Sequence, residues 1–332
     1  MSDEVKRALK NENKHRNQSV RRYPLYTNMR NSLPTVAVGI PAYNEAGNIG
    51  FLIEDLLRQK TESFRLEQIL ILSDGSSDGT VAIARSYQDE RIKVVDNQDR
   101  KGKAARQNQI FETVESDILV MLDADVLLYR NNFLEELVAP ILEEDADLVA
   151  AKIEPLKPKT WVERGLFASV LVKNRAFEMF RGGNNIFTCA GVGRAFSRRF
   201  YPMLRFTDSV GEDAYSYLYC TSYGLTYRYA PKAVLGIRLP DNIRDHARQS
   251  YRYQDSQKRF AEEFGIFFVQ KEYALPKPLL MQAVAFVGII KPFSLSFYFL
   301  FMAFLSLRKM LRVAEATDTW EVAESSKVLR SS

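Results

Sequence analysis

Two acidic residues, Asp123 and Asp125, follow a strongly apolar segment and are separated by a single alanine. The apolar segment, Ile118–Leu122, has the length of a strand that is buried on both faces of a parallel sheet. Side chains alternate along an extended chain, so both carboxylates can point to one side while Ala124 points to the other. Such a pair suits a hard divalent cation, Mg²⁺ or Mn²⁺, especially one that also holds a diphosphate. A lone Asp-x-Asp is more often a loop opening or a helix cap, so the metal hypothesis depends on the neighbouring motifs.

The first predicted strand, 35–40, also ends in polar residues. It runs into Pro41-Ala-Tyr-Asn-Glu45, where the ring of Tyr43 and the carboxylate of Glu45 could hold a nucleobase and a ribose. An ordinary turn from strand to helix, with the asparagine as a helix cap, explains the same pentapeptide equally well. An amphipathic helix is predicted next, because one apolar face collects Ile49, Leu52, Ile53, Leu56 and Leu57.

Two more polar segments follow the second and third predicted strands, 68–73 and 92–95. Asp74 ends the second strand and can accept an N–H group of a base, while Asp78 is expected to cap the following helix. Gly102 and Lys103 open the helix after the third strand, where a close backbone approach and a positive charge suit a phosphate. The alternative there is a solvated lysine. Parallel strands end at one edge of an open α/β sheet, so these groups are expected to converge.

The alternation of strands with helices predicts an α/β fold with a doubly wound, mostly parallel sheet and helices on both faces. A helix at 132–144 and a strand at 148–153 complete this regular half. Beyond Pro155 we expect a helix at 161–180, a strand-like segment at 186–196, a tyrosine-rich helix after Gly211-Glu-Asp213 and a strand at 225–229. No Gly-x-Gly-x-x-Gly follows the first strand, which argues against a nucleotide-dependent oxidoreductase.

The composition excludes several other classes of protein. An apolar fraction of 46% with 12% aromatic residues describes a folded chain. Residues 1–33 hold eight of the 46 Lys and Arg residues and three of the 41 Asp and Glu residues, so the remainder is balanced and no nucleic-acid partner is expected. Two cysteines and two histidines form neither a disulfide framework nor a zinc pattern, which favours a reducing compartment. The first thirty residues contain no apolar segment of a signal peptide.

Taken in order, these motifs resemble the family-two glycosyltransferases of the GT-A fold. The resemblance runs from Thr35 to about Tyr253 and rests on six segments: Pro-Ala-Tyr-Asn-Glu, Ser-Asp-Gly-Ser-Ser-Asp-Gly-Thr, Gly-Lys-Ala-Ala, Asp-Ala-Asp, Gly-Glu-Asp and Gln249-Ser-Tyr-Arg252-Tyr253. Each segment alone is a modest signal, but their order is highly specific. The resemblance implies an inverting transfer of a sugar from a nucleotide-diphosphate donor, with a UDP-sugar as the first candidate and Mg²⁺ or Mn²⁺ as the cofactor.

The resemblance also assigns roles to single residues. It places Asp74 at the base, Asp123 at the ribose and sugar, Asp125 at the metal, and Asp213 at the acceptor hydroxyl as the catalytic base. The dipole of the predicted helix is expected to keep Asp213 ionised, although a plain helix cap explains the same position. The other matching residues on the donor side are Pro41, Tyr43, Glu45, Gly102, Lys103, Gln249 and Arg252. Those on the acceptor side are Ala190, Gly191, Glu212 and Tyr253.

Tyr253 stands where the Gln-x-x-Arg-Trp element of related enzymes has tryptophan, so the ring can still stack on a sugar but the indole N–H is absent. His246 lies where several relatives carry a metal-binding or phosphate-binding histidine, but a lone histidine is more often a partly buried surface residue. The main alternative to an enzyme is a carbohydrate-binding or nucleotide-binding protein that has lost turnover. The joint presence of Asp123, Asp125 and Asp213 counts against that alternative.

An apolar block at 279–307 is interrupted by Lys291-Pro292. At 1.5 Å per residue its two halves reach only about 18 Å and 22 Å, short of a hydrocarbon core of roughly 30 Å. Lysines and arginines flank both ends, which favours keeping both on the cytosolic side. We therefore expect a helical pair embedded in or lying on the membrane, with Pro292 at its turn. The alternative is a helical pair buried inside the soluble fold.

These observations divide the chain into four parts. We expect a basic tail (1–33), a GT-A catalytic domain (34–255), membrane-associated helices (256–312) and a C-terminal tail (313–332). Within the catalytic domain, 34–153 is expected to bind the nucleotide sugar and 154–255 the acceptor. The expected acceptor is a glycan that is lipid-linked or emerges from a membrane. The expected location is the cell membrane, with the catalytic domain facing the cytoplasm.

Overall fold

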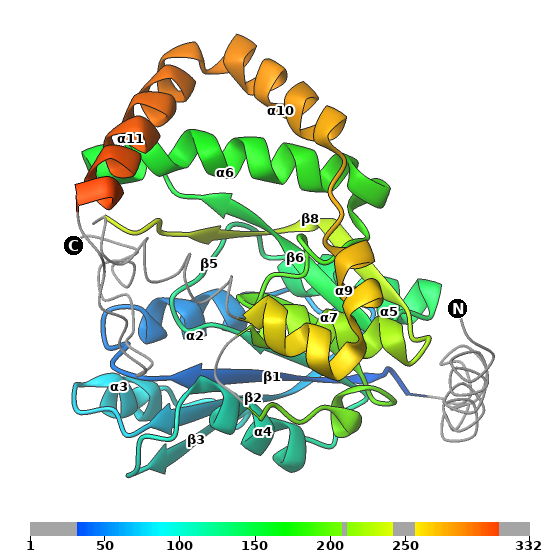
Figure 1. Ribbon diagram of the computed structural model, residues 1–332. Coiled ribbons are helices and arrows are strands. Elements are labelled where there is room, and N and C mark those ends of the chain that lie inside the picture. Colours follow the sequence, from blue (N-terminus) through cyan, green and yellow to red (C-terminus); the bar gives the residue numbers. More distant parts are fainter. Residues whose placement is uncertain (1–31, 208–210, 242–255, 312–332) are drawn as a thin grey trace, which may run out of the picture.

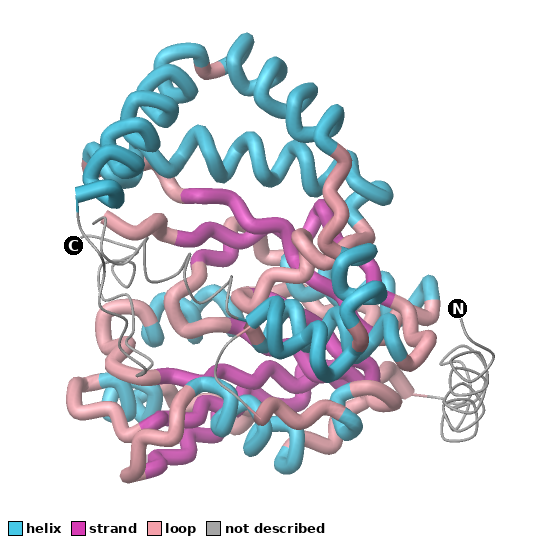
Figure 2. Tube along the Cα trace, viewed as in Figure 1, coloured by secondary structure: helices cyan, strands magenta, loops and turns pink. Residues whose placement is uncertain are grey.

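In the computed structural model, which describes residues 32–207, 211–241 and 256–311, one mixed sheet forms the centre of the protein (Figure 1). The strand order is β3-β2-β1-β4-β7-β6-β8-β5. Helices cover both faces of this sheet, and a further helical layer lies outside one of them (Figure 2). The predicted α/β class, with helices on both faces, is confirmed.

Four parallel strands form the regular half of the sheet. They are β1 (Thr35–Ala42), β2 (Arg65–Asp74), β3 (Ile92–Asn97) and β4 (Ile118–Leu122). β1 pairs in parallel with β2 on one side and with β4 on the other, and β2 pairs in parallel with β3. All four carboxyl ends therefore lie at the same edge of the sheet, as predicted.

The other half of the sheet is mixed. It contains β5 (Leu127–Leu128), β6 (Leu148–Pro155), β7 (Gly193–Ser197) and β8 (Tyr227–Ile237). β7 runs antiparallel to both of its neighbours, β4 and β6, whereas β6 and β8 are parallel. The predicted strand at 186–196 is wrong over 186–192. Those residues form turns, because the side chains of Asn185 and Thr188 bond to nearby backbone carbonyl groups, which competes with strand pairing.

Side-chain alternation along β1 explains how helices attach to both faces. Val36, Val38 and Ile40 point into the apolar core on one face, and Ala37 points into the core on the other. The first face is covered by α2 (Ile49–Leu57), α3 (Thr80–Ser86) and α5 (Phe133–Glu144). The second face is covered by α4 (Lys103–Thr113), α7 (Glu212–Ser222), a helical segment at 256–264 and α9 (Ile266–Glu272).

Three helices form the outer layer: α6 (Trp161–Met179), α10 (Lys277–Ile290) and α11 (Pro292–Leu311) (Figure 1). α6 begins with a capping box, in which the side chains of Thr160 and Glu163 each accept the other's backbone N–H. The predicted break is confirmed, since α10 ends at Ile290 and Pro292 begins α11, where its missing N–H costs no helical hydrogen bond. The layer is held together by small and branched residues: Ala168, Val172, Ala176, Ala283, Val287 and Leu295.

The opposite side of the α10–α11 pair is apolar and exposed. Phe293 is 90% exposed and Ile289 is 80% exposed. In the described part of the chain, one segment, Ile266–Ile290, has the length and composition of a membrane-crossing helix. That segment is not one straight helix, because α9 ends before α10 begins at Lys277. The pair is attached to the fold by one side only, so the alternative of a pair buried inside the fold is wrong.

Candidate active site

Lys103 links the two sides of the candidate site. Its Nζ lies 2.7 Å from Oδ1 of Asp123, which follows β4, and 2.9 Å from Oε1 of Glu212 at the start of α7. The three side chains are between 13% and 18% exposed. Burial lowers the pKa of Lys103, but the two carboxylates outweigh burial and the pKa is raised, so the lysine is charged at neutral pH. The alternative of a solvated lysine is wrong.

We expect Lys103→Met to lower the free energy of unfolding by about 3 kcal/mol, because two largely buried carboxylates lose their cation. The matched control is Lys101→Met, since Lys101 pairs with Asp99 at 3.0 Å but is 62% exposed. Its effect should stay within about 0.5 kcal/mol. Urea-induced unfolding followed by circular dichroism measures both variants. If Lys103→Met and Lys101→Met had the same free energy of unfolding, Lys103 would not hold the carboxylates together.

Asp125 lies in a strongly negative part of the site, beside Asp123 and Glu45. Burial, and then the charges of these two carboxylates, raises the pKa of Asp125 to about 7, and Lys103 only partly offsets the shift. A divalent cation would neutralise such a cluster, and carboxylate oxygens are ligands that Mg²⁺ and Mn²⁺ prefer. Within 32–207, 211–241 and 256–311, no three His, Cys, Asp or Glu side chains are arranged to hold a metal. A cation here would need ligands beyond these side chains, which a diphosphate fits, and the predicted ligand His246 lies outside the described residues.

The first turn of α7 places Asp213 beside Gly191. A Cβ on Gly191 would lie 3.4 Å from the Cβ of Asp213 and 3.7 Å from Oε1 of Glu212. Burial, and then the charge of Glu212, raises the pKa of Asp213, and Arg194 and the N–H of Ala214 only partly counter this shift. Burial moves this pKa in the direction opposite to the effect of the helix dipole, and the expectation that Asp213 is ionised stays a prediction. A raised pKa suits a group that takes up a proton.

Arg194 is a site residue to which the sequence assigns no role. Its side chain is fully buried in β7, where Nη1 donates to the carbonyl oxygen of Glu212 (3.0 Å) and to Oγ of Ser216 (2.6 Å). Its Nε and Nη2 have no hydrogen-bond partner among the described residues. Burial raises the pKa of Glu212, but the charges of Lys103 and Arg194 outweigh burial and lower it. Arg194 is a charged residue within β7, a five-residue strand that is wholly buried. Because arginine is rarely fully buried, this position is the signal that points to Arg194.

Asp74 at the end of β2 is engaged by the protein itself. Its carboxylate accepts the backbone N–H groups of Lys101 and Gly102 and the Nε–H of Arg106, each at 2.8 Å. Gly102 has a φ of 91°, a conformation that favours glycine. Asp74 thus shapes the loop before α4, and its predicted contact with a nucleobase stays a prediction.

The loops after β1 and β2 hold each other. Asn44 has a φ of 52°, and its Oδ1 accepts the N–H of Ser77 at 2.9 Å. The alternative in which this asparagine caps the next helix is therefore wrong. Asp78 accepts the N–H of Thr80, the first residue of α3, at 3.0 Å, although the N-cap position itself is Gly79.

The remaining residues predicted on the donor side lie at the same edge. Pro41 is buried in β1, and the carboxylate of the buried Glu45 accepts Nδ2–H of Asn48 at 2.9 Å. The guanidinium of Arg100 lies 4.0 Å from the ring centroid of Tyr43, so a base that stacks on this ring would meet Arg100 as well. The roles of Pro41, Tyr43 and Glu45 toward a donor stay predictions.

Among the residues predicted on the acceptor side, Ala190 is half-buried next to Gly191. His246, Gln249, Arg252 and Tyr253 lie outside the described residues, and their roles stay predictions.

The sequence model of glycosyl transferase family 2 matches residues 37–203, half of the chain. The chain belongs to glycosyl transferase family 2. The matched range contains the predicted residues from Pro41 to Asp125, together with Ala190 and Gly191, and ends before Glu212 and Asp213. Membership therefore rests on the strands and loops that surround the carboxylate cluster.

Curated relatives match only part of their own length. Glycosyltransferase AglE of Haloferax volcanii is 32% identical over 128 residues, which are 38% of this chain and 41% of AglE.

Two solved structures share the fold over most of the chain. The mannosyltransferase PcManGT from Pyrobaculum calidifontis, in complex with GDP-Man and Mn²⁺, aligns with a TM-score of 0.55 at 20% identity, over 86% of this chain and 84% of that one. Glucosyl-3-phosphoglycerate synthase from Mycobacterium tuberculosis, in complex with Mn²⁺, UDP and phosphoglyceric acid, aligns with a TM-score of 0.52 at 18% identity, over 73% of this chain and 80% of that one.

Proposed function

We propose that the protein is an inverting glycosyltransferase that moves a sugar from a nucleotide-diphosphate donor to a hydroxyl of an acceptor glycan. The observation that carries the proposal is the cluster around Lys103, which contacts Asp123 on one side and Glu212, the neighbour of Asp213, on the other. The side with Asp123 fits a divalent cation and its diphosphate. The side with Glu212 and Asp213 fits an acceptor hydroxyl that must lose a proton. Membership of family 2 supports the same class of reaction.

In this proposal Asp213 removes the proton of the acceptor hydroxyl while the hydroxyl oxygen attacks the anomeric carbon of the donor. The bond from that carbon to the diphosphate oxygen breaks, and attack from the opposite face inverts the configuration. A cation held by Asp125, with Asp123 nearby, would supply positive charge beside the leaving diphosphate. Lys103 adds a second positive charge on that side. Gly191 leaves space for the acceptor beside Asp213.

The ligands of the structural relatives support a donor of this type, since one relative is bound to GDP-Man and Mn²⁺ and the other to UDP and Mn²⁺. A UDP-sugar remains our first candidate. We assign the base and ribose to Tyr43, Glu45 and Asp74. The diphosphate and acceptor channel is assigned to the segment with Gln249 and Arg252, which the family resemblance places there.

An assay of the purified full-length protein with a panel of UDP-sugars and GDP-sugars, with and without Mn²⁺ or Mg²⁺, tests the proposal. We expect slow hydrolysis of one nucleotide sugar that depends on the divalent cation, and transfer once an acceptor glycan is added. Tight binding of a nucleotide sugar without either reaction would instead support a binding protein that has lost turnover.

We also propose that the acceptor is lipid-linked or emerges from a membrane, and that the apolar side of α10 and α11 lies against that membrane. Large exposed apolar surfaces mark interaction sites. The exposed surface includes Met281 and Leu300, each 71% exposed, and Phe267 of α9 is itself 85% exposed. Lys277 and Lys291 stand at the two ends of α10, where their charges suit anionic headgroups. We propose in addition that the catalytic domain lies on the cytoplasmic side of the cell membrane.

We expect the double substitution Ile289→Glu and Phe293→Glu to weaken binding to phospholipid vesicles by at least about tenfold, because two charges enter the apolar side. Both residues face away from α6, so the fold should be unaffected. The control is Val95→Glu on the edge strand β3, where Val95 is also exposed. Co-sedimentation with vesicles of mixed zwitterionic and anionic phospholipid measures all three proteins. Unchanged sedimentation of the double variant would remove the membrane proposal.

If the chain lies on the cytoplasmic side of the membrane, its C-terminal end is not accessible from outside the cell. Both native cysteines are buried, so Ser331→Cys introduces a distinct labelling site. A membrane-impermeant thiol reagent should label it only after the cells are permeabilised. Labelling in intact cells would mean that the chain crosses the membrane.

A further inference from the structure

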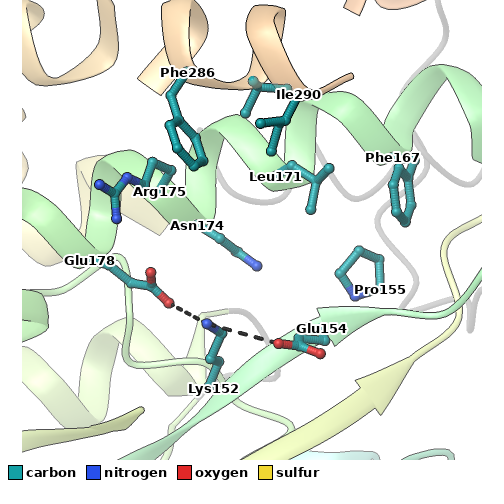
Figure 3. A pocket seen from close by; sticks show the side chains of 11 residues that line it. Lys152, Glu154, Pro155, Phe167, Leu171, Asn174, Arg175, Glu178, Phe286 and Ile290 are labelled. Carbon is teal, nitrogen blue, oxygen red and sulfur yellow. Dashed lines mark ion pairs between the residues drawn. The ribbon is translucent and has the colours of Figure 1, made fainter. Parts of the chain in front are cut away.

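A pocket of about 400 Å³ lies between α6, α10 and the end of β6 (Figure 3). Its volume falls in the range of small-molecule sites, and none of the carboxylates around Lys103 lines it. Figure 3 shows Lys152, Glu154 and Glu178 at the polar floor, with Phe286 and Ile290 of α10 pointing down from the roof. The reaction proposed above uses none of these residues.

The charges that line the pocket cancel. Lys152 Nζ lies 2.9 Å from a carboxylate oxygen of Glu178 and 3.9 Å from one of Glu154. Arg175 supplies the second cation, with its guanidinium 4.9 Å from the ring centroid of Phe286. Two cations and two carboxylates leave no net charge to attract an ion. They offer several donors and acceptors close together, which suits a neutral ligand with many hydroxyl groups.

An amide adds to this set of polar groups. Asn174 projects from α6 toward the floor, and its Nδ2 donates to the carbonyl oxygen of Ile153 at 2.8 Å. This bond orients the side chain and leaves Oδ1 to accept from a ligand. Planar amides, carboxylates and guanidinium groups beside apolar rings provide both kinds of surface that a sugar ring presents, its hydroxyls and its C–H face.

The roof of the pocket is continuous with the apolar side of α10. Phe286 is 44% exposed and Ile290 is 49% exposed, although both line the pocket. Ile289, next in sequence to Ile290, is 80% exposed on the surface that we propose to lie against the membrane. A ligand whose polar head rests on the floor can therefore place an apolar chain along α10.

The pocket and the acceptor side are built on neighbouring strands. Ala150, two residues before Lys152 on β6, pairs with Arg194 of β7, whose guanidinium donates to the carbonyl oxygen of Glu212. Gly193 is two residues beyond Gly191, which lies beside Asp213. This neighbouring placement suits an acceptor of several units that contacts both the pocket and Asp213.

We infer that this pocket binds a neutral sugar unit of the acceptor, at a distance from the hydroxyl that reacts. The role of the pocket as an acceptor subsite rests on the proposed function. The binding itself needs neither donor nor metal, so it can be tested separately. A neutral, hydroxyl-rich head next to an apolar chain is the chemistry that the floor and the roof together recognise.

Isothermal titration of the full-length protein with octyl β-D-glucoside, below its micelle concentration, tests this inference. Octyl phosphate and 1-octanol are the comparison ligands, because they share the chain but carry a charged head or a single hydroxyl. We expect octyl glucoside to bind at least about tenfold more tightly than either. Octyl phosphate or 1-octanol binding equally well would overturn the inference.

Two variants place the binding in this pocket. Leu171→Trp fills the pocket from α6, and Phe286→Ala removes a ring from its partly exposed roof. Each should weaken binding of octyl glucoside by about tenfold, while Val95→Trp, on the edge strand β3 and outside the pocket, should not. If Leu171→Trp does not fold, Phe286→Ala still tests the pocket, because Phe286 is partly exposed. Unchanged binding by Phe286→Ala and by folded Leu171→Trp would place the ligand elsewhere. Failed sugar transfer with retained binding would contradict the proposed reaction and not the pocket.

Discussion

Asp213→Asn is expected to lower the rate of sugar transfer by about 10²- to 10⁴-fold while the affinity for the donor stays unchanged. The amide cannot take up the proton of the acceptor hydroxyl. Its oxygen can still accept the N–H of Ala214, as Oδ1 of Asp213 does at 2.7 Å, so the start of α7 should be preserved. Steady-state transfer kinetics, together with titration of the nucleotide sugar, separate the two effects.

Glu212→Gln is the informative companion to this variant. Glu212 has a lowered pKa and is paired with Lys103, so it is a poorer proton acceptor than Asp213, whose pKa is raised. We expect Glu212→Gln to reduce transfer less than Asp213→Asn. Wild-type transfer by Asp213→Asn, combined with collapse in Glu212→Gln, would move the catalytic base to Glu212.

Asp125→Asn is expected to abolish most turnover and to remove the dependence of donor binding on Mn²⁺. The carboxylate is the proposed protein ligand of the cation, and a neutral amide oxygen is a much weaker ligand beside a diphosphate. Isothermal titration of the donor in the presence and absence of Mn²⁺ measures the effect. Donor affinity in Mn²⁺ that is unchanged by the substitution would show that the metal is held elsewhere.

A matched control for this variant is Asp89→Asn. Asp89 pairs with Arg91 just before β3, at the opposite edge of the sheet from Asp125. Removing its charge should leave both turnover and the Mn²⁺ dependence unchanged. The comparison separates a specific loss of the cation from a general loss of negative charge.

The regular half of the fold was predictable because its signals are local. β4 is five consecutive apolar residues, and α2 has one apolar face, so length and periodicity identify both without knowledge of their neighbours. The loop at 186–192 was not predictable in this way. Its residues have an apolar pattern, but side-chain bonds from Asn185 and Thr188 decide its conformation.

The residues of the site could be named from the sequence, but their electrostatics could not. The ion pair between Lys103 and Glu212 joins positions more than one hundred residues apart, and no spacing rule reports such a contact. The raised pKa of Asp213 depends on burial by the surrounding fold, whereas the sequence shows only a helix start. The side of α10 that packs on α6 likewise depends on small residues of α6, such as Ala168 and Ala176.

The position of β7 has a consequence for how the chain reaches its native state. β7 lies between β4 and β6, so those two strands, although consecutive long strands in sequence, are never paired with each other. During synthesis, β4 and β6 emerge with open edges that stay unpaired until residues 193–197 leave the ribosome. Open strand edges are prone to aggregate, and sheets closed by distant segments assemble slowly. The two halves of the sheet can therefore join only after β7 is made, and a chain halted before β7 would expose the open edges of β4 and β6.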